Sequence, residues 1–381
     1  MSSIVIKKVN SKKDLKTFID FHYDLYAGNA YDVPNLFSDD LKTLSKEKNA
    51  AFDFCEADYF LAYKDGKVVG RVAAIINRHA NERWNTSQVR FGWFDFIDDQ
   101  EVSAALLKAV EDWGRERGMT EVVGPMGFID TDREGMLVEG FDQLATMYIN
   151  YNYPYYPQHI ERLKGFEKAN DWVECRAKVP EVVPEKFSKI TEMVRRRYNL
   201  RAHKFTRHEL MKEGKAREVF ELLNTTYKDL YGFCQLSDRQ IDKLVGDYIK
   251  IADLNLVVGI VDGNENDKLV GFGITFPSFS RALQKTRDGR LFPFGWWHLL
   301  KILKWHKTDT VDLLLIGVLP EYRAKGANGL IFDDLIRQYQ AYGFSYAETG
   351  PMMETNEGVL SHWQYLDSVI HRRHRCFKKI L

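Results

Sequence analysis

The chain contains two copies of one arrangement of segments, and this repeat limits the folds that it can adopt more than any other feature. Residues 59–74 form two apolar runs separated by Lys-Asp-Gly, which predicts a strand, a short turn and a second strand. Residues 256–275 repeat this plan with a longer polar turn. Such a repeat indicates that one structural unit occurs twice.

The repeat continues beyond these strands. A stretch with helical periodicity follows at 102–117 in the first copy and at 330–342 in the second. Gly-Pro-Met then occurs in both copies, beginning at Gly124 and at Gly350. Strands and helices in this order predict an α/β fold (α+β mixed sheet) in which each sheet is partly parallel.

The length of the chain agrees with two domains. A chain of 381 residues exceeds what one hydrophobic core usually serves. The first copy continues to about Pro180, so we predict one domain over residues 1–180 and a second over 181–381.

The segment best suited to chemistry lies between Leu313 and Phe332. It begins as an apolar strand and reaches Pro320, which cannot continue a strand ladder. A basic turn with two glycines follows, and then a helix that Gly343 would end. A strand, a glycine-bearing turn and a helix start direct backbone N–H groups toward a phosphate. An ordinary basic surface turn is the alternative.

The order Val318-x-Pro320-x-x-Arg323-x-x-Gly326 resembles the pyrophosphate-binding signature of the GNAT acyltransferase superfamily. The family pattern is Arg/Gln-x-x-Gly-x-Gly/Ala, and here Asn328 takes the last position. The resemblance implies two tandem GNAT-like domains, and an acyl-coenzyme A, expected to be acetyl-CoA, whose pyrophosphate is held by the turn. It also implies that the preceding strand splays from its neighbour to admit the pantetheine arm. The expected coenzyme-binding residues are Val318, Arg323, Ala324, Lys325, Gly326, Ala327, Asn328 and Gly329.

The first copy differs at the equivalent place. It has no glycine there, and it carries Asp98, Asp99 and Glu101 where a pyrophosphate would lie. Like charges a few ångströms apart repel by roughly 1–4 kcal/mol per pair at surface dielectrics. We therefore expect the 1–180 domain to lack a coenzyme site, and its acidic residues to cap the following helix instead.

The resemblance also implies catalytic roles. The oxyanion donor would be the backbone N–H of Gly317 or Val318, on the strand before the turn. The family acid is commonly a tyrosine seven residues past an asparagine, but counting from Asn356 leads to Trp363. Tyr365 is the substitute by residue type, or the coenzyme thiolate leaves without an acid.

Other residues near this place are candidates for binding and base catalysis. Glu354 and Glu348 are candidate bases, with a solvated carboxylate or a helix cap as the alternative. Asn356 and Met352 are expected to contact substrate, although Asn356 could equally be a plain helix N-cap.

Composition excludes several classes of function. Lys plus Arg and Asp plus Glu both number 54, so the net charge is zero and we expect no nucleic-acid partner. Four separated cysteines indicate reduced thiols. His371 and His374 would project to opposite faces of a strand, so no metal is expected. The first twenty residues are polar and mixed in charge, so we expect no signal peptide and a cytoplasmic protein.

An aromatic segment between the strands of the second copy stands apart from the repeat. From Trp296 on, its pattern suits an amphipathic helix, with Trp and Leu on one side and Lys301, Lys304 and Lys307 on the other. We expect it to pack on the N-terminal domain or to wall an acceptor pocket. Contact with a membrane surface through 292–305 is the less favoured alternative.

These observations together predict an acyl-CoA-dependent N-acyltransferase that acts on a small-molecule amine or a peptide. A degenerate binding or scaffold protein that keeps the fold is the alternative. The paired domains also resemble the Fem-type aminoacyl transferases, but those need a basic RNA track that a neutral chain lacks. The identity of the acceptor and the oligomeric state stay open.

Overall fold

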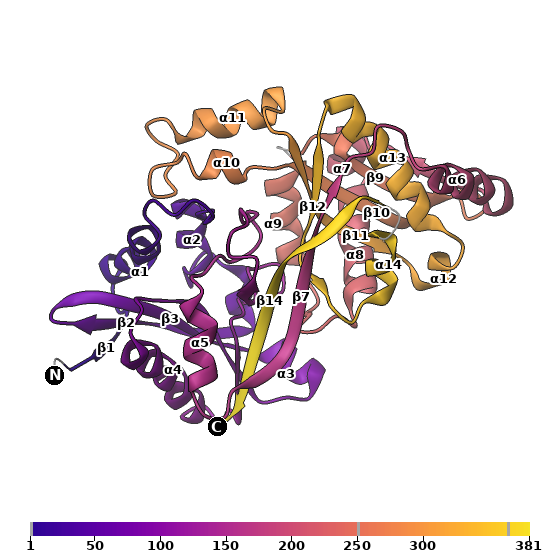
Figure 1. Cartoon of the computed structure of the whole chain (residues 1–381). Coiled ribbons are helices and arrows are strands. Elements are labelled where there is room, and N and C mark those ends of the chain that lie inside the picture. The colour runs from indigo at the N-terminus through magenta and orange to yellow at the C-terminus, as the bar shows by residue number, and fades with distance from the viewer. Residues whose placement is uncertain (1–2, 250–251, 364–365) are drawn as a thin grey trace. The chain divides into compact units, whose positions relative to one another are not determined.

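The computed structural model describes residues 3–249, 252–363 and 366–381 (Figure 1). The chain divides into two compact units. The first unit comprises the chain up to Val173, Ser280–Leu299 and His371–Leu381. The second unit comprises Glu174–Phe279 and Leu300–Ile370. Segments from the C-terminal half of the sequence thus belong to the first unit.

The first unit is built on a mixed sheet. Four of its strands run antiparallel in sequence order: β1 (Val5–Lys8), β2 (Cys55–Lys64), β3 (Lys67–Asn77) and β4 (Gln88–Phe96). A parallel pairing then joins β4 to β5 (Glu121–Gly124). The C-terminal end of β14 (Ser368–Ile380) pairs antiparallel with β5, and β6 (Met136–Glu139) also pairs with β14.

The second unit repeats this order of strands. Its antiparallel strands are β8 (Leu200–His203), β9 (Val257–Asp262), β10 (Lys268–Pro277) and β11 (Thr310–Val318). A parallel pairing joins β11 to β12 (Tyr346–Thr349), and the end of β7 (Glu167–Lys178) pairs antiparallel with β12. A short strand, β13 (Met352–Met353), also pairs with β7. The predicted α/β fold with partly parallel sheets is confirmed.

Each sheet takes its last strand from the other half of the sequence. The first unit receives β14, the final strand of the chain, and the second unit receives the end of β7. The compact units are defined in space, whereas the division after residue 180 follows the sequence order of the two repeats. We keep that division, with its domains 1–180 and 181–381, as a proposal about the repeats.

Helices cover both sheets. Those of the first unit are α1 (Lys12–Leu25), α2 (Phe37–Thr43), α3 (Arg78–Trp84), α4 (Gln100–Arg115), α5 (Tyr155–Arg162) and α10 (Ser280–Leu283). Those of the second are α6 (Glu185–Tyr198), α7 (Arg207–Lys212), α8 (Lys215–Tyr227), α9 (Asp238–Tyr248), α12 (Pro320–Arg323), α13 (Ala327–Tyr342) and α14 (Glu357–Trp363). One further helix, α11 (Gly295–Trp305), begins in the first unit and ends in the second. Two 3-10 turns are present at Ala50–Asp53 and Leu254–Leu256.

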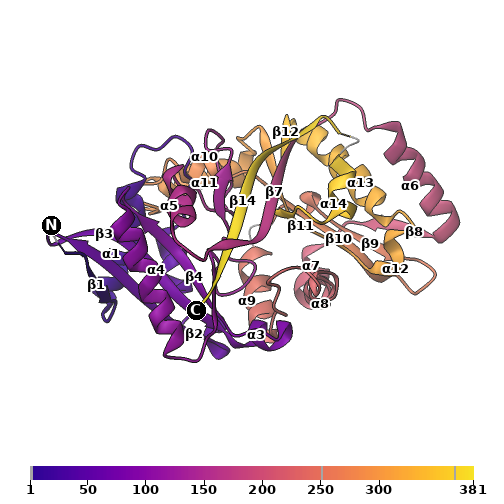
Figure 2. The ribbon, with the colours of Figure 1, turned by 60° about the horizontal axis from the view of Figure 1, so that its bottom comes forward.

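The helix α13 shows why the sequence pattern predicted these elements well. Its residues Ile331, Leu335 and Tyr339 recur at helical spacing, and all three are buried in the core of the second unit. Gly343 ends the helix with φ +72°, a left-handed conformation that glycine adopts without strain. Figure 2 shows α13 and α6 on one face of this sheet and α7 and α8 on the other. Within the described residues, no helix has the length and apolar character needed to cross a bilayer.

Candidate functional site

The strand β11 has one edge that its neighbours leave open. It pairs with β10 from Val311 to Val318, but its described pairing with β12 ends at Leu313. The register with β10 shifts just after Leu313, so that Leu314 has no partner opposite it on β10. The strand therefore diverges from β12 at a bulge, as the family resemblance led us to expect. Among the described pairings, the edge from Leu314 to Val318 faces no strand on the β12 side.

The direction of the amides along this edge follows from one hydrogen bond. The Leu319 N–H donates to the Val270 carbonyl, on the β10 side, at 2.9 Å. Because successive amides in a strand point to opposite sides, Gly317 N–H points toward β10 and Val318 N–H toward the open edge. Val318 is thus better oriented than Gly317 to donate to a ligand at the open edge.

A tyrosine occupies part of this open edge. The Ile316 N–H donates to the Tyr227 phenol oxygen at 3.3 Å, and the phenol donates to the Ile316 carbonyl at 3.2 Å. Tyr227 is half-buried at the last turn of α8. A phenol in this place has a proton that it can donate to a ligand bound along the strand edge. No local sequence pattern pointed to Tyr227, because its partner on β11 lies far along the chain.

The basic turn follows β11 directly. Pro320 opens the short helix α12, and Gly326, with φ +87°, precedes the first residue of α13. Arg323 and Ala324 are exposed, whereas Lys325 lies over the Tyr322 ring, with its amine 4.0 Å from the ring centroid. The exposed part of the turn is therefore open to a ligand.

The remaining predicted turn residues are less exposed. Ala327 and Gly329 are buried, and Asn328 is half-buried. A Cβ on Gly329 would lie 2.6 Å from a methyl carbon of Ile190 on α6, so glycine is required by this close approach. The helix α6 thus covers one side of the turn.

The Arg323 side chain folds back onto the protein. Its Nε donates to the Val318 carbonyl at 3.0 Å, and Nη2 lies 3.5 Å from the Thr226 carbonyl on α8. The guanidinium therefore ties the end of β11 to α8. A single arginine in this position can brace the turn while its charge remains near the exposed surface.

The residues predicted past β12 have mainly structural contacts. The Trp363 indole is buried and donates to the Met352 sulfur at 3.2 Å. Asn356 caps α14, since its side-chain oxygen accepts from Val359 N–H at 3.3 Å. Glu354 is half-buried in the turn between β13 and α14, and Glu348 is buried on β12 with Arg176 Nε 3.7 Å from its carboxylate. Tyr365 lies outside the described residues.

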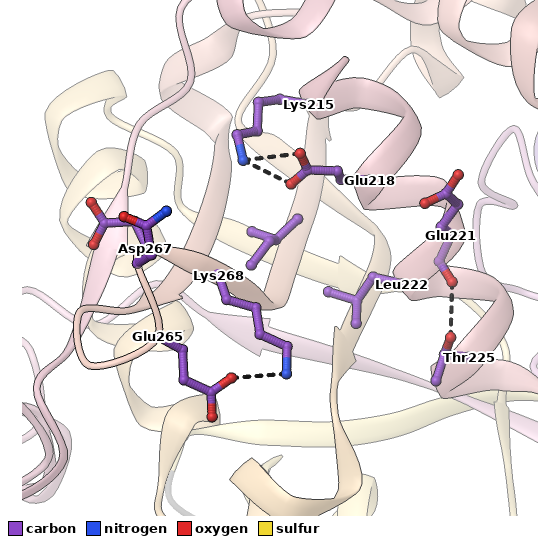
Figure 3. Close-up of a pocket in the computed structure, with 10 residues that line it drawn as sticks. Lys215, Glu218, Glu221, Leu222, Thr225, Glu265, Asp267 and Lys268 are labelled. Atoms are coloured by element: carbon purple, nitrogen blue, oxygen red, sulfur yellow. Dashed lines mark hydrogen bonds and ion pairs between the residues drawn. The ribbon is translucent and has the colours of Figure 1, made fainter. Parts of the chain in front are cut away.

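A cavity of about 520 Å³ opens beside this region (Figure 3). It is formed by α8 and the turn between β9 and β10. Both lysines of its lining are already paired, Lys215 with Glu218 at 2.8 Å and Lys268 with Glu265 at 3.0 Å. Glu221 and Asp267 add further negative charge to its lining. This excess of carboxylates disfavours a diphosphate, so the coenzyme hypothesis depends on the turn and the strand edge and not on this cavity.

The equivalent place in the first unit is a helix cap. The Asp99 side chain accepts from Glu101 N–H at 2.9 Å at the start of α4, and Lys64 donates to it at 2.6 Å. That hydrogen bond from Lys64 holds the pKa of Asp99 below its ordinary value. Asp98 pairs with His159 at 3.0 Å. Asp99 thus caps the helix as expected, whereas Asp98 contacts a histidine instead.

The first unit also holds two perturbed carboxyls that the sequence analysis did not select. Burial raises the pKa of Asp132 to about 6, although its carboxylate accepts from the Phe128 and Ile129 N–H groups at 2.8 and 3.2 Å. Burial also raises the pKa of Glu134 well above its ordinary value. Carboxyls that titrate near neutrality can serve as acids or bases, but structural networks produce the same shift. In the sequence, these two carboxyls are indicated only by acidic residues that follow the Gly-Pro-Met motif.

No cluster of three or more histidine, cysteine or acidic side chains suited to a metal was found in the part of the chain that the structure describes. His374 is buried, and its Nε2 lies 2.9 Å from the Asn150 carbonyl.

Comparison with known proteins gives relatives along almost the whole chain. It is 28% identical to protein YghO of Escherichia coli over 98% of this chain and 95% of that protein. It is 24% identical to a bacterial ceramide synthase of Caulobacter vibrioides over 98% of this chain and 96% of that enzyme. Among solved structures it resembles a tandem GNAT protein of the clavulanic acid biosynthesis pathway, with a TM-score of 0.57 and 11% identity over 99% and 98% of the two chains. No family model matches the chain.

Proposed function

This chain has a tandem GNAT fold, and we propose that its second unit transfers an acyl group from an acyl-coenzyme A to an amine. The observation that supports this most directly is the open edge of β11, which leads straight into the glycine turn. An extended pantetheine arm carries amides that can hydrogen-bond to such an edge as an added strand would. The exposed start of the turn, at Arg323 and Ala324, would then meet the pyrophosphate.

The proposed reaction needs three groups. The amine nitrogen attacks the thioester carbonyl, a C–N bond forms, and the C–S bond breaks as the coenzyme thiolate leaves. Val318 N–H, at the open edge, would donate to the oxyanion of the tetrahedral intermediate. Tyr227 would protonate the thiolate, and Glu354 would accept the proton that the amine loses. Tyr365, the acid expected from the sequence, is replaced in this proposal by Tyr227.

The acceptor in this proposal is an amine on a long apolar chain. A ceramide is the amide of a long-chain amino alcohol and a fatty acid, and the Caulobacter relative is named for making one. The donor would then be a fatty acyl-CoA in preference to the acetyl-CoA expected from the sequence. The first unit would have a structural role without a coenzyme site of its own.

The test introduces a charge at an exposed residue of the turn. Ala324→Glu places a carboxylate beside the proposed pyrophosphate, and Ala324→Gln is the matched control of equal size without charge. Repulsion of roughly 1–4 kcal/mol per charge pair predicts that Ala324→Glu weakens acyl-CoA binding by about tenfold or more relative to Ala324→Gln. Calorimetric titration with acetyl-CoA and palmitoyl-CoA measures this. Equal affinities for the two variants would show that the turn does not bind the pyrophosphate.

A second candidate is a binding protein that has the fold without turnover. Trp363, at the family's acid position, is buried in the core and donates a hydrogen bond to the Met352 sulfur, which favours a binding protein without turnover. Incubation of the chain with palmitoyl-CoA and a sphingoid base separates the two candidates. Release of free thiol with amide formation supports the transferase, whereas coenzyme binding without either product supports the binding protein.

A further inference from the structure

The segment from Ser280 to Trp305 has an anchored base and an exposed aromatic end. At the base, Gln284 Nε2 donates to the Ala30 and Asp32 carbonyls, each at 2.9 Å. The Arg290 guanidinium pairs with Asp20 at 2.8 Å, and Phe37 N–H donates to the Gly289 carbonyl at 3.0 Å. Figure 1 shows this segment, in orange, beside α2. The base is therefore fixed to the first unit.

The end of the segment presents large apolar side chains to solvent. Phe292 is 78% exposed and Phe294 73%, in the loop before α11. Trp296 and Trp297, in the first turn of α11, are 43% and 40% exposed. The base of the segment therefore packs on the first unit, whereas these four rings are exposed. Four adjacent exposed aromatics are unusual for a surface that only meets water.

Basic side chains are frequent in the same segment. From Arg281 to Lys307 the chain has seven Lys or Arg residues and one acidic residue, a net charge of +6 in a chain whose total is zero. Arg281, Lys285 and Arg287 are exposed around the anchored base, and Lys304 is exposed farther along α11. Trp296 and Trp297 are thus exposed on the same helix as Lys304.

We propose that residues 281–307 bind the surface of an anionic phospholipid bilayer. Phe292 and Phe294 would enter the boundary between headgroups and acyl chains, and Trp296 and Trp297 would lie at the headgroup level, where indole rings are favoured. The basic side chains would contact lipid phosphates, because an anionic leaflet attracts Lys and Arg near its surface. The exposed Phe and Trp rings and the Lys and Arg side chains occur together in one short segment, and this combination favours a bilayer over a second copy of the chain.

The test uses the full chain and vesicles of two compositions. Flotation is measured with phosphatidylcholine vesicles that contain about 30 mol% phosphatidylglycerol, and with pure phosphatidylcholine vesicles. We expect binding at least about tenfold tighter to the anionic vesicles at about 0.1 M salt, and most of that difference lost at about 0.5 M salt. Equal binding to both vesicles, or none to either, overturns the proposal.

Two sets of variants connect the binding to this segment. The double variant Phe292→Ser with Phe294→Ser should weaken binding to anionic vesicles by about tenfold or more, since it removes both rings that enter the bilayer. Val182→Ser, at an apolar residue of the second unit that is 79% exposed, is the matched control and should bind as the unaltered chain does. Arg287→Gln with Lys304→Gln should lower the affinity for anionic vesicles and leave binding to neutral ones unchanged.

The same variants distinguish a bilayer from other occupants. If the chain forms a dimer in the absence of lipid that the Phe292→Ser and Phe294→Ser double variant dissociates, the surface is an interface between copies and the proposal is wrong. If that double variant binds vesicles normally, the aromatic end is not the membrane contact. Acyl-CoA affinity, measured in parallel, should be unaffected by every variant, so vesicle binding can be judged whether or not the transferase proposal holds.

Discussion

The phenol oxygen of Tyr227 lies 3.2 Å from the carbonyl oxygen of Ile316 and 3.3 Å from its amide nitrogen, at the strand edge that β12 leaves open. No other tyrosine hydroxyl has a described hydrogen bond to β11 between Leu314 and Val318 in residues 3–249, 252–363 and 366–381. A group in this place can reach a thioester that lies along the edge. It can also simply satisfy two backbone groups.

Replacement of Tyr227 by phenylalanine separates these roles. If the phenol protonates the departing thiolate, Tyr227→Phe should lower kcat by about 100-fold, change KM little, and remove the fall in rate at alkaline pH. Steady-state rates over a pH series measure this. Tyr342→Phe, which loses hydrogen bonds to Asp253 and Asn255 elsewhere in the unit, is the control. A variant that loses stability but keeps its kcat would assign Tyr227 a purely structural role.

Asp132 should make stability fall as the pH rises from about 4 to 6. Its pKa is about 6 in the folded protein against an ordinary value of 3.8, so the folded state binds more protons in this window. The stabilisation is complete below the unfolded pKa and is lost as the pH rises through the folded pKa. We expect Asp132→Asn, which stays neutral, to gain about 1–3 kcal/mol relative to the unaltered chain between pH 4 and 7. Urea unfolding at several pH values tests this, and parallel curves for both proteins would contradict it.

His22 should change the stability of the fold in a different pH window. Burial disfavours its charge, but the carboxylates of Asp32 and Asp95 outweigh burial and raise its pKa to about 9. A raised histidine pKa stabilises the fold below the ordinary value of 6.5, and that contribution is lost as the pH rises through 9. The unaltered chain should therefore lose about 2–3 kcal/mol relative to His22→Gln between pH 7 and 10. Thermal unfolding across this range measures the difference, and a constant gap between the two proteins would show that His22 is neutral in the fold.

Asp99 should matter for the stability of the first unit and not for coenzyme binding. Asp99→Ala removes the N-cap of α4 and should cost about 1 kcal/mol. Asp99→Asn keeps an oxygen that can accept from Glu101 N–H, so it should retain most of that stability while losing the charge that pairs with Lys64. Denaturant unfolding compares the two. Acyl-CoA affinity should be the same in both variants and the unaltered chain, and a change would indicate a coenzyme site in the first unit.

Local patterns predicted the elements of this protein because they depend on residues close in sequence. The buried stripe of α13, the glycine that ends it and the cap at Asp99 follow from spacing and from side chains a few residues apart. The repeat predicted the same order of strands in both units, and that order is present. The sequence therefore determined the tandem α/β architecture and the position of the turn at Gly326.

Contacts between distant residues were decided only in the tertiary structure. Tyr227 and Ile316 are 89 residues apart, and nothing in the local sequence of either specifies their hydrogen bond. Three other features also depend on contacts between distant residues. They are the exchange of β7 and β14 between the units, the divergence of β11 from β12, and the exposure of Phe292 and Trp296. Strand register and side-chain exposure depend on which surfaces pack together, and periodicity along the chain shows that a face is apolar without showing what covers it.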